Sequence, residues 1–180
     1  MMKKLSMEEL GRLSVEEFKQ TKKLPLVVVL DNIRSMNNIG SVFRTADAFK
    51  IEKIFLCGIT AQPPHKDIEK TALGATQSVD WAYFTNTLEA IDWLQKEKYQ
   101  LFSVEQTTDS LLLHHVQWDG QTKIALIFGN EVHGVEQNVI DKCEKSIEIP
   151  QFGTKHSLNI AVSAGVVLWH FCQLYLQNNQ

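Results

Sequence analysis

Cysteine is scarce in this sequence, and the few cysteines are not placed for cross-linking. The 180 residues include only Cys57, Cys143 and Cys172, which lie far apart and form no Cys-x-x-Cys pair. An odd number of scattered cysteines argues against a disulfide framework and against a zinc site. We therefore expect three reduced thiols, most of them buried.

Long apolar runs and an excess of positive charge are also missing. No eighteen uncharged apolar residues follow one another, and the basic pair near the N-terminus has no apolar segment behind it. These features predict a cytoplasmic protein without a membrane-spanning segment. The net charge of −3 gives no sign of a nucleic-acid partner, so any RNA contact must come from a local patch. The candidate cations, which fit a solvated face equally well, are Lys3, Lys4, Arg12, Lys19, Lys22, Lys23, Arg34 and Arg44.

Several catalytic signatures are absent as well. The sequence has no Gly-x-Ser-x-Gly elbow, no Walker A motif, no His-Glu-x-x-His and no Asp-rich calcium loop. His114 and His115 are neighbours, so on a strand their side chains would point to opposite faces and could not share a metal. We therefore predict no metal site.

The sequence does contain strands alternating with helices. Residues 26–30 form an apolar, β-branched run typical of a strand covered on both faces. A polar loop over 31–40, a helix over 42–49 and a strand over 54–57 complete a βαβ unit. Further strands are expected at 79–84, 101–104, 124–128 and 146–149, and further helices at 88–96, 135–142 and 157–176.

This order predicts one α/β domain over residues 25–180, with a mostly parallel sheet and helices on both faces. Residues 1–24 are expected to form an N-terminal helical extension. Ser6 and Ser14 each begin a Ser-x-x-Glu capping box, which indicates one or two short helices there.

Ligands of parallel sheets bind beyond the carboxyl ends of the strands, so three loops are candidates for a site. In the first, Asn38 precedes Arg44 by six residues, and a bend at the helix start would bring both to one anion-binding pocket. The alternative is an asparagine N-cap with a surface arginine. In the second, Gly129 and Gly134 allow close approach of a ligand to the backbone.

The second and third loops leave further alternatives open. Glu131 is either a site residue or a carboxylate stabilised by a helix dipole, and His133 fits a solvent-facing loop position. Ser157 is a good N-cap for the last helix. Asn159, inside the expected first turn, is harder to explain structurally because asparagine is a mediocre helix former.

Together the three loops resemble the signature motifs of the SpoU/TrmH ribose methyltransferases of the SPOUT class. The first motif is matched by Asn38-Ile39-Gly40 with Arg44-Thr45-Ala46, and the second by Phe128-Gly129-Asn130-Glu131 with Gly134-Val135. The third is matched by Ile149-Pro150, Ser157-Leu158-Asn159 and Ala161-Val162-Ser163-Ala164-Gly165. The resemblance extends over roughly residues 26–168, with the motifs in the same order.

The resemblance implies transfer of a methyl group from S-adenosylmethionine to a ribose 2′-hydroxyl of tRNA or rRNA. It also implies a deep trefoil knot near the C-terminus and a homodimer that completes the active site. Backbone groups near Val104, Gly129, Ile149, Ser157 and Leu158 would hold S-adenosylmethionine.

By the same resemblance Arg44 is the central catalytic residue, and Asn38, Glu131, Ser157 and Asn159 position it and the substrate. A guanidinium is effectively always protonated, so we expect Arg44 to stabilise the developing alkoxide and the phosphate rather than to act as a base.

Three rival hypotheses keep parts of this pattern. One is a non-catalytic RNA-binding protein of the same fold, and another is a related enzyme that methylates guanine N1. A third is a small dinucleotide-binding enzyme, but the acidic partner of the ribose is not where that fold needs it.

The dimer is also expected because the last helix has apolar residues on more than one side, namely Val162, Val166, Val167 and Trp169.

Overall fold

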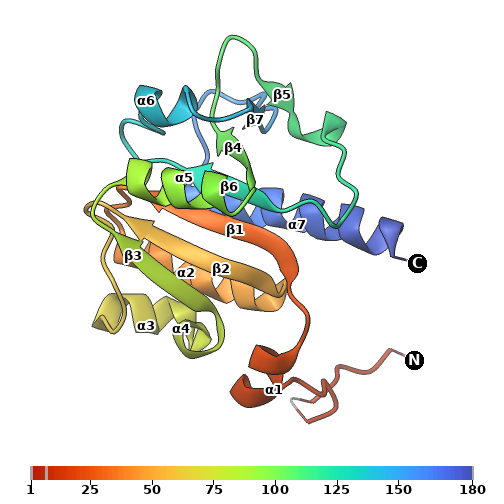
Figure 1. The fold of residues 1–180 in the computed structure, drawn as a ribbon. Helices are drawn as coiled ribbons and strands as arrows, with labels where there is room; N and C mark the ends of the chain where they lie inside the picture. The colour runs from red at the N-terminus through yellow and green to blue at the C-terminus, as the bar shows by residue number, and fades with distance from the viewer. Residues whose placement is uncertain (1, 7, 180) are drawn as a thin grey trace.

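The computed structural model describes residues 2–6 and 8–179 and contains a sheet of seven parallel strands in the order β3-β2-β1-β6-β4-β7-β5 (Figure 1). The strands are β1 (Leu24–Asp31), β2 (Ile51–Cys57), β3 (Asp80–Phe84), β4 (Gln100–Val104), β5 (Leu111–Leu112), β6 (Ile124–Phe128) and β7 (Lys145–Glu148). The helices are α1 (Val15–Gln20), α2 (Met36–Ala48), α3 (Lys66–Ala72), α4 (Ala75–Ser78), α5 (Thr87–Lys96), α6 (Gln137–Ile140) and α7 (Ile160–Asn178), with a 3₁₀ turn η1 (Leu113–His115).

Alternate residues of β1 supply two separate apolar cores, one on each face of the sheet. Val27 and Val29 pack with α5 and α6, whereas Leu26, Val28 and Leu30 pack with α2 and α7. Figure 1 shows α5 on one side of the sheet and α2 with α7 on the other. Because both faces are covered, β1 and β6 are almost entirely buried, which is why they read as unbroken apolar runs. The predicted α/β fold with helices on both faces is confirmed.

The parallel arrangement brings the carboxyl ends of the central strands to one edge of the sheet. Leu30 of β1 pairs with Phe128 of β6, which in turn pairs with Val104 of β4. Val104 also pairs with Ile147 of β7. The loops that follow these four strands therefore leave the sheet side by side.

Two helix starts differ from the sequence prediction, and in both cases a capping side chain explains why. α2 begins at Met36, inside the predicted polar loop, because the hydroxyl of Ser35 accepts a hydrogen bond from the Asn38 amide at 3.3 Å. α7 begins at Ile160 rather than Ser157, and its N-cap is Asn159. The predicted helix over 135–142 is reduced to the four residues of α6.

The short elements between β2 and β3 and between β4 and β6 were not predicted. They comprise α3, α4, β5 and η1. His114 and His115 lie in η1 and not on a strand, so their rings are neighbours with centroids 4.1 Å apart, and the argument from opposite strand faces is wrong. Across residues 2–6 and 8–179 there is still no group of three His, Cys, Asp or Glu residues that could hold a metal ion.

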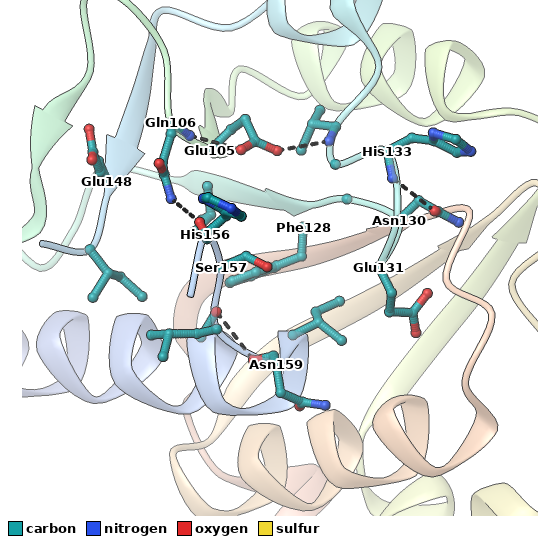
Figure 2. A pocket seen from close by; sticks show the side chains of 18 of the residues that line it. Glu105, Gln106, Phe128, Asn130, Glu131, His133, Glu148, His156, Ser157 and Asn159 are labelled. Atoms are coloured by element: carbon teal, nitrogen blue, oxygen red, sulfur yellow. Dashed lines mark hydrogen bonds between the residues drawn. The ribbon is translucent and has the colours of Figure 1, made fainter. Parts of the chain in front are cut away.

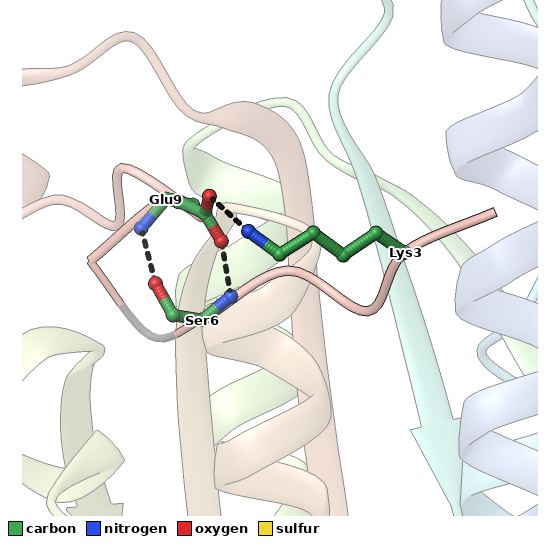
Figure 3. Close-up of polar contacts among 3 residues, drawn as sticks. All are labelled: Lys3, Ser6 and Glu9. Atoms are coloured by element: carbon green, nitrogen blue, oxygen red, sulfur yellow. Dashed lines mark hydrogen bonds and ion pairs between the residues drawn. The ribbon is translucent and has the colours of Figure 1, made fainter. Parts of the chain in front are cut away.

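Among the described residues of the N-terminal segment, one helix forms, α1. At Ser6 the reciprocal capping bonds form, with the Ser6 amide 2.7 Å from a Glu9 carboxylate oxygen, and Lys3 approaches the same carboxylate (Figure 3). A turn over residues 8–11 follows instead of a helix, and Met7 lies outside the described residues. The second box, at Ser14, begins α1, whose Phe18 is buried in the α2/α7 core.

α7 has one buried face and one exposed apolar face. By length and composition it could also cross a membrane, but its inner residues, such as Ala164 and Leu168, are fully buried against the sheet. Val167 is buried too, so its prediction as surplus apolar surface is wrong. The predicted exposure holds for Val162, Val166 and Trp169, which are 40–52% exposed.

The three cysteines are free thiols. Cys57 is buried and the other two are half-buried. Burial raises the pKa of Cys57 and of Cys143 to about 12, so both stay protonated near neutral pH.

Candidate functional site

A cavity of about 570 Å³ opens at the carboxyl edge of the sheet, between the loops that follow β4, β6 and β7 (Figure 2). This volume lies within the range of about 300–1,000 Å³ that is typical of small-molecule sites. All five residues predicted to hold a cofactor line it: Val104, Gly129, Ile149, Ser157 and Leu158. The fold thus brings together in space positions that are spread over 55 residues of the chain.

The loop after β6 closes on itself at one side of the cavity. Asn130 and Gly134 form two backbone hydrogen bonds of 2.9 and 3.0 Å. A side chain at Gly129 would begin 2.1 Å from the backbone of Gly134, so this position requires glycine. Gly134 has a φ of +69°, a left-handed conformation that also favours glycine. Both glycines are therefore needed for the conformation of this loop. Glu131 lies at the tip of the loop.

Glu131 joins this loop to the start of α2. Its carboxylate accepts hydrogen bonds from the backbone amides of Arg34 and Ser35, both at 3.0 Å, and from the side-chain amide of Asn38 at 3.1 Å. Partial burial acts to raise the pKa of Glu131, but these hydrogen bonds outweigh it and lower the pKa below the ordinary value of 4.5. Glu131 therefore lies at a helix start and also lines the cavity.

Asn38 and Asn159 connect the helix starts of α2 and α7. The Asn159 side-chain oxygen accepts from the Ala161 amide at 2.8 Å as the N-cap, and its NH₂ group donates to the Asn38 oxygen at 3.1 Å. Asn38 in turn donates to Glu131. Three of the predicted site residues thus form one hydrogen-bonded chain, with Glu131 and Asn159 lining the cavity.

The remaining predicted residues differ in position. Ser157 is exposed in the loop before α7 and lines the cavity, but it is not the N-cap. His133 also lines the cavity from an exposed position. Arg44 lies six residues after Asn38 on α2, exposed to solvent, and the described lining residues do not include it. The expected pocket shared by Asn38 and Arg44 is therefore not formed within one chain.

The sequence reading missed Glu105 and Gln106, which follow β4 directly. Glu105 accepts a hydrogen bond from the Val135 amide at 3.1 Å, and the Gln106 side chain donates to the His156 carbonyl at 2.8 Å (Figure 2). These two hydrogen bonds connect the loop after β4 to the loops after β6 and β7, which form the other two sides of the cavity. The rule that ligands bind beyond strand ends could have singled out both residues, because they are the first polar positions after a predicted strand.

Comparisons with known proteins agree with this site. The model of the SpoU rRNA Methylase family matches residues 25–169. The chain is 30% identical over 144 residues to the 23S rRNA (guanosine-2′-O-)-methyltransferase RlmB of Neisseria meningitidis serogroup B, covering 80% of this chain and 56% of that protein. It is also 30% identical over 166 residues to RlmB of Haemophilus ducreyi, covering 90% and 65%. The chain spans less than two thirds of the length of these curated relatives.

Solved structures show the same fold. The A. aeolicus TrmH/SpoU tRNA modifying enzyme superimposes with a TM-score of 0.80 at 22% identity, covering 91% of this chain and 81% of that one. The AdoMet-bound rRNA methyltransferase from Sinorhizobium meliloti gives a TM-score of 0.77 at 26% identity, covering 86% and 57%. Since the family model matches residues 25–169, which is most of the chain, the chain belongs to the SpoU rRNA methylase family.

Proposed function

We propose that this chain transfers a methyl group from S-adenosylmethionine to a ribose 2′-hydroxyl of tRNA or rRNA. The observation that carries the proposal is the cavity, where the five expected cofactor residues meet the Glu131–Asn38–Asn159 chain. The family membership and the names of the relatives support the same reaction. RNA substrates also fit a cytoplasmic location.

The lining residues fit S-adenosylmethionine. Val104, Ile149 and Leu158 offer apolar surface for its adenine ring. Glu105 and Glu148 also line the cavity, and their negative charge complements the cationic cofactor. When bound, S-adenosylmethionine supplies a methyl group activated by a positively charged sulfur.

The residues of the chain would orient the ribose for this transfer. The lowered pKa of Glu131 makes it a weak base at neutral pH, so its role is to accept hydrogen bonds and hold the Asn38 amide. Ser157, exposed on the cavity wall, is free to hydrogen-bond the incoming ribose hydroxyl. These contacts hold the nucleophile in one geometry, which supplies a large part of the rate of a bimolecular transfer.

Arg44 would stabilise the charge that develops on the ribose oxygen and on the adjacent phosphate. Because Arg44 lies outside the cavity of its own chain, the proposal requires a second copy to bring it there. α2 packs against α7, whose exposed face carries Val162, Val166 and Trp169, so Arg44 is on a helix that borders the proposed dimer interface. The proposal includes this dimer, a trefoil knot formed by residues near the C-terminus, and a methyltransferase domain over 25–180 with the extension 1–24.

Two measurements test the function. Calorimetry should detect binding of S-adenosylmethionine and not of NAD, since NAD binding would favour a dinucleotide enzyme. The protein should then transfer labelled methyl groups to an RNA mixture of tRNA and rRNA, but not to DNA, which lacks the 2′-hydroxyl. Cofactor binding without any transfer would favour a non-catalytic RNA-binding protein and contradict the proposal.

A further inference from the structure

Phe152 is the most exposed large apolar residue among those described in the sheet domain. Its side chain is 96% exposed, in the loop between β7 and α7. The other exposed aromatic residues contact neighbours: Trp93 lies edge-on to Phe55, Trp169 lies 5.7 Å from Phe49, and the Tyr83 hydroxyl donates to the Gly58 carbonyl. A phenyl ring that no neighbour covers would gain free energy from burial against another molecule, and its place beside the cavity makes it a candidate contact.

The position of this ring relates it to the cavity. Gln151, the preceding residue, and His156, four residues later, both line the cavity. The loop is fixed near its end, where the His156 carbonyl accepts the hydrogen bond from Gln106 and Asn159 caps α7. In between, a side chain at Gly153 would meet no atom within 4 Å, so the middle of the loop stands clear of the domain. The ring therefore stands at the rim of the cavity.

The charges near the ring favour RNA as the occupant. Lys155 and His156 lie on the same loop, and no aspartate or glutamate occurs anywhere after Glu148. An aromatic face beside a lysine, without competing carboxylates on the same segment, matches single-stranded nucleic-acid sites, in which bases stack on rings and cations follow the phosphates. A target ribose is presented by unpaired nucleotides, whose neighbouring bases are free to stack on aromatic side chains.

We propose that Phe152 stacks on a base of the RNA substrate next to the target nucleotide, with Lys155 contacting the adjoining phosphate. This inference rests on the proposed RNA methyl transfer and adds a residue that selects and positions the substrate. Phe152 would act in RNA binding and not in cofactor binding, because it is not among the residues that line the cavity and its side chain is almost fully exposed.

The test uses the full chain and fluorescently labelled bulk tRNA and rRNA fragments as probes, with the dissociation constant measured by anisotropy. Phe152→Ala should weaken RNA binding by roughly tenfold or more, the loss expected for one stacked base. Phe152→Tyr should keep wild-type affinity because it keeps a ring, whereas Phe152→Leu should behave like alanine. Ile59→Ala, at a 66% exposed apolar position in another loop, should leave RNA affinity unchanged.

Three results would overturn the inference. If Phe152→Ala binds RNA within twofold of the wild-type affinity, Phe152 makes no stacking contact with RNA. If Phe152→Leu binds RNA with wild-type affinity, the contact requires only an apolar side chain and not a stacked aromatic ring. Loss of S-adenosylmethionine binding or of the dimer in Phe152→Ala would assign the ring to the cavity or to a second copy. Since anisotropy does not require methyl transfer, a wild-type protein that binds RNA but transfers nothing would refute the proposed function alone.

Discussion

At the scale of single residues, Glu131 connects the loop after β6 to the start of α2. Its carboxylate holds two backbone amides at the start of α2 and the side chain of Asn38. All three partners donate to it, so the ionised form is the one that the fold stabilises and the neutral acid would lose part of each contact.

Glu131→Gln should therefore destabilise the protein in a pH-dependent way. The folded-state pKa of Glu131 is lowered, so its contribution to the free energy of unfolding is present above the ordinary pKa of 4.5 and is lost as the pH falls through the folded-state pKa. Urea unfolding should show the variant less stable than wild type at pH 7, with the difference shrinking under acid conditions. A difference that grows on acidification would contradict the lowered pKa.

Gly134→Ala tests the loop after β6. The substitution places a side chain at a φ of +69° and within 2.2 Å of the Glu105 carboxylate, so we expect a loss of about 1–3 kcal/mol in unfolding free energy. S-adenosylmethionine binding should weaken too, because this loop is a wall of the cavity. Gly153→Ala, which meets no neighbouring atom, should change stability by less than about 0.5 kcal/mol. Equal effects of the two substitutions would contradict the assigned geometry.

Arg44→Ala should reduce methyl transfer by roughly a hundredfold or more, the loss expected when one preorganised charge is removed from the transition state. Because Arg44 is assigned to the ribose oxygen and the phosphate and not to the cofactor, binding of S-adenosylmethionine by calorimetry should stay near wild type. A fall in activity of only a fewfold would show that the catalytic residue has been wrongly assigned.

At the scale of elements, Asn159 combines two roles that substitutions can separate. It caps α7 through its oxygen and contacts Asn38 through its NH₂ group. Asn159→Ser should keep the cap and most of the stability, whereas Asn159→Ala should cost about 1 kcal/mol. Both should lower the rate of methyl transfer, since both lose the link to Asn38. Full activity in the serine variant would reduce Asn159 to a structural cap.

The sequence predicted long elements well and short or polar ones poorly. The buried strands β1 and β6 and the helix α5 were recognised because their apolar patterns are local. The start of α2 was placed too late, because Ser35 caps a first turn whose asparagines read as a loop. α3 and α4 carry few apolar residues and were missed.

The cavity was predictable from the strand ends and the loops that follow them. Gly129, Ile149 and Leu158 line the cavity as expected. The spacing of Asn38 and Arg44 was misleading, because six residues on a helix are about 1.7 turns and point two side chains in different directions. Glu105 and Gln106 were overlooked although their side chains connect the loop after β4 to the loops after β6 and β7.

At the scale of the whole molecule, the proposed dimer joins two incomplete sites. Val166→Glu places a charge on the exposed face of α7 and should convert a dimer of 20.5 kDa chains into monomers in light scattering. Methyl transfer should be lost with the dimer, since Arg44 would no longer reach the cavity. Ile59→Glu, at an exposed position away from α7, should leave both properties unchanged. A wild-type monomer at micromolar concentration would contradict the dimer.

The position of the transferred methyl group tests the central claim most directly. RNA methylated with labelled S-adenosylmethionine should be digested to nucleosides and separated by mass, next to a substrate with 2′-deoxyribose at the target position. We predict that all label is found in 2′-O-methylated nucleosides and that the deoxy substrate receives none. Label in a base such as N1-methylguanosine, or transfer to the deoxy substrate, would contradict the account.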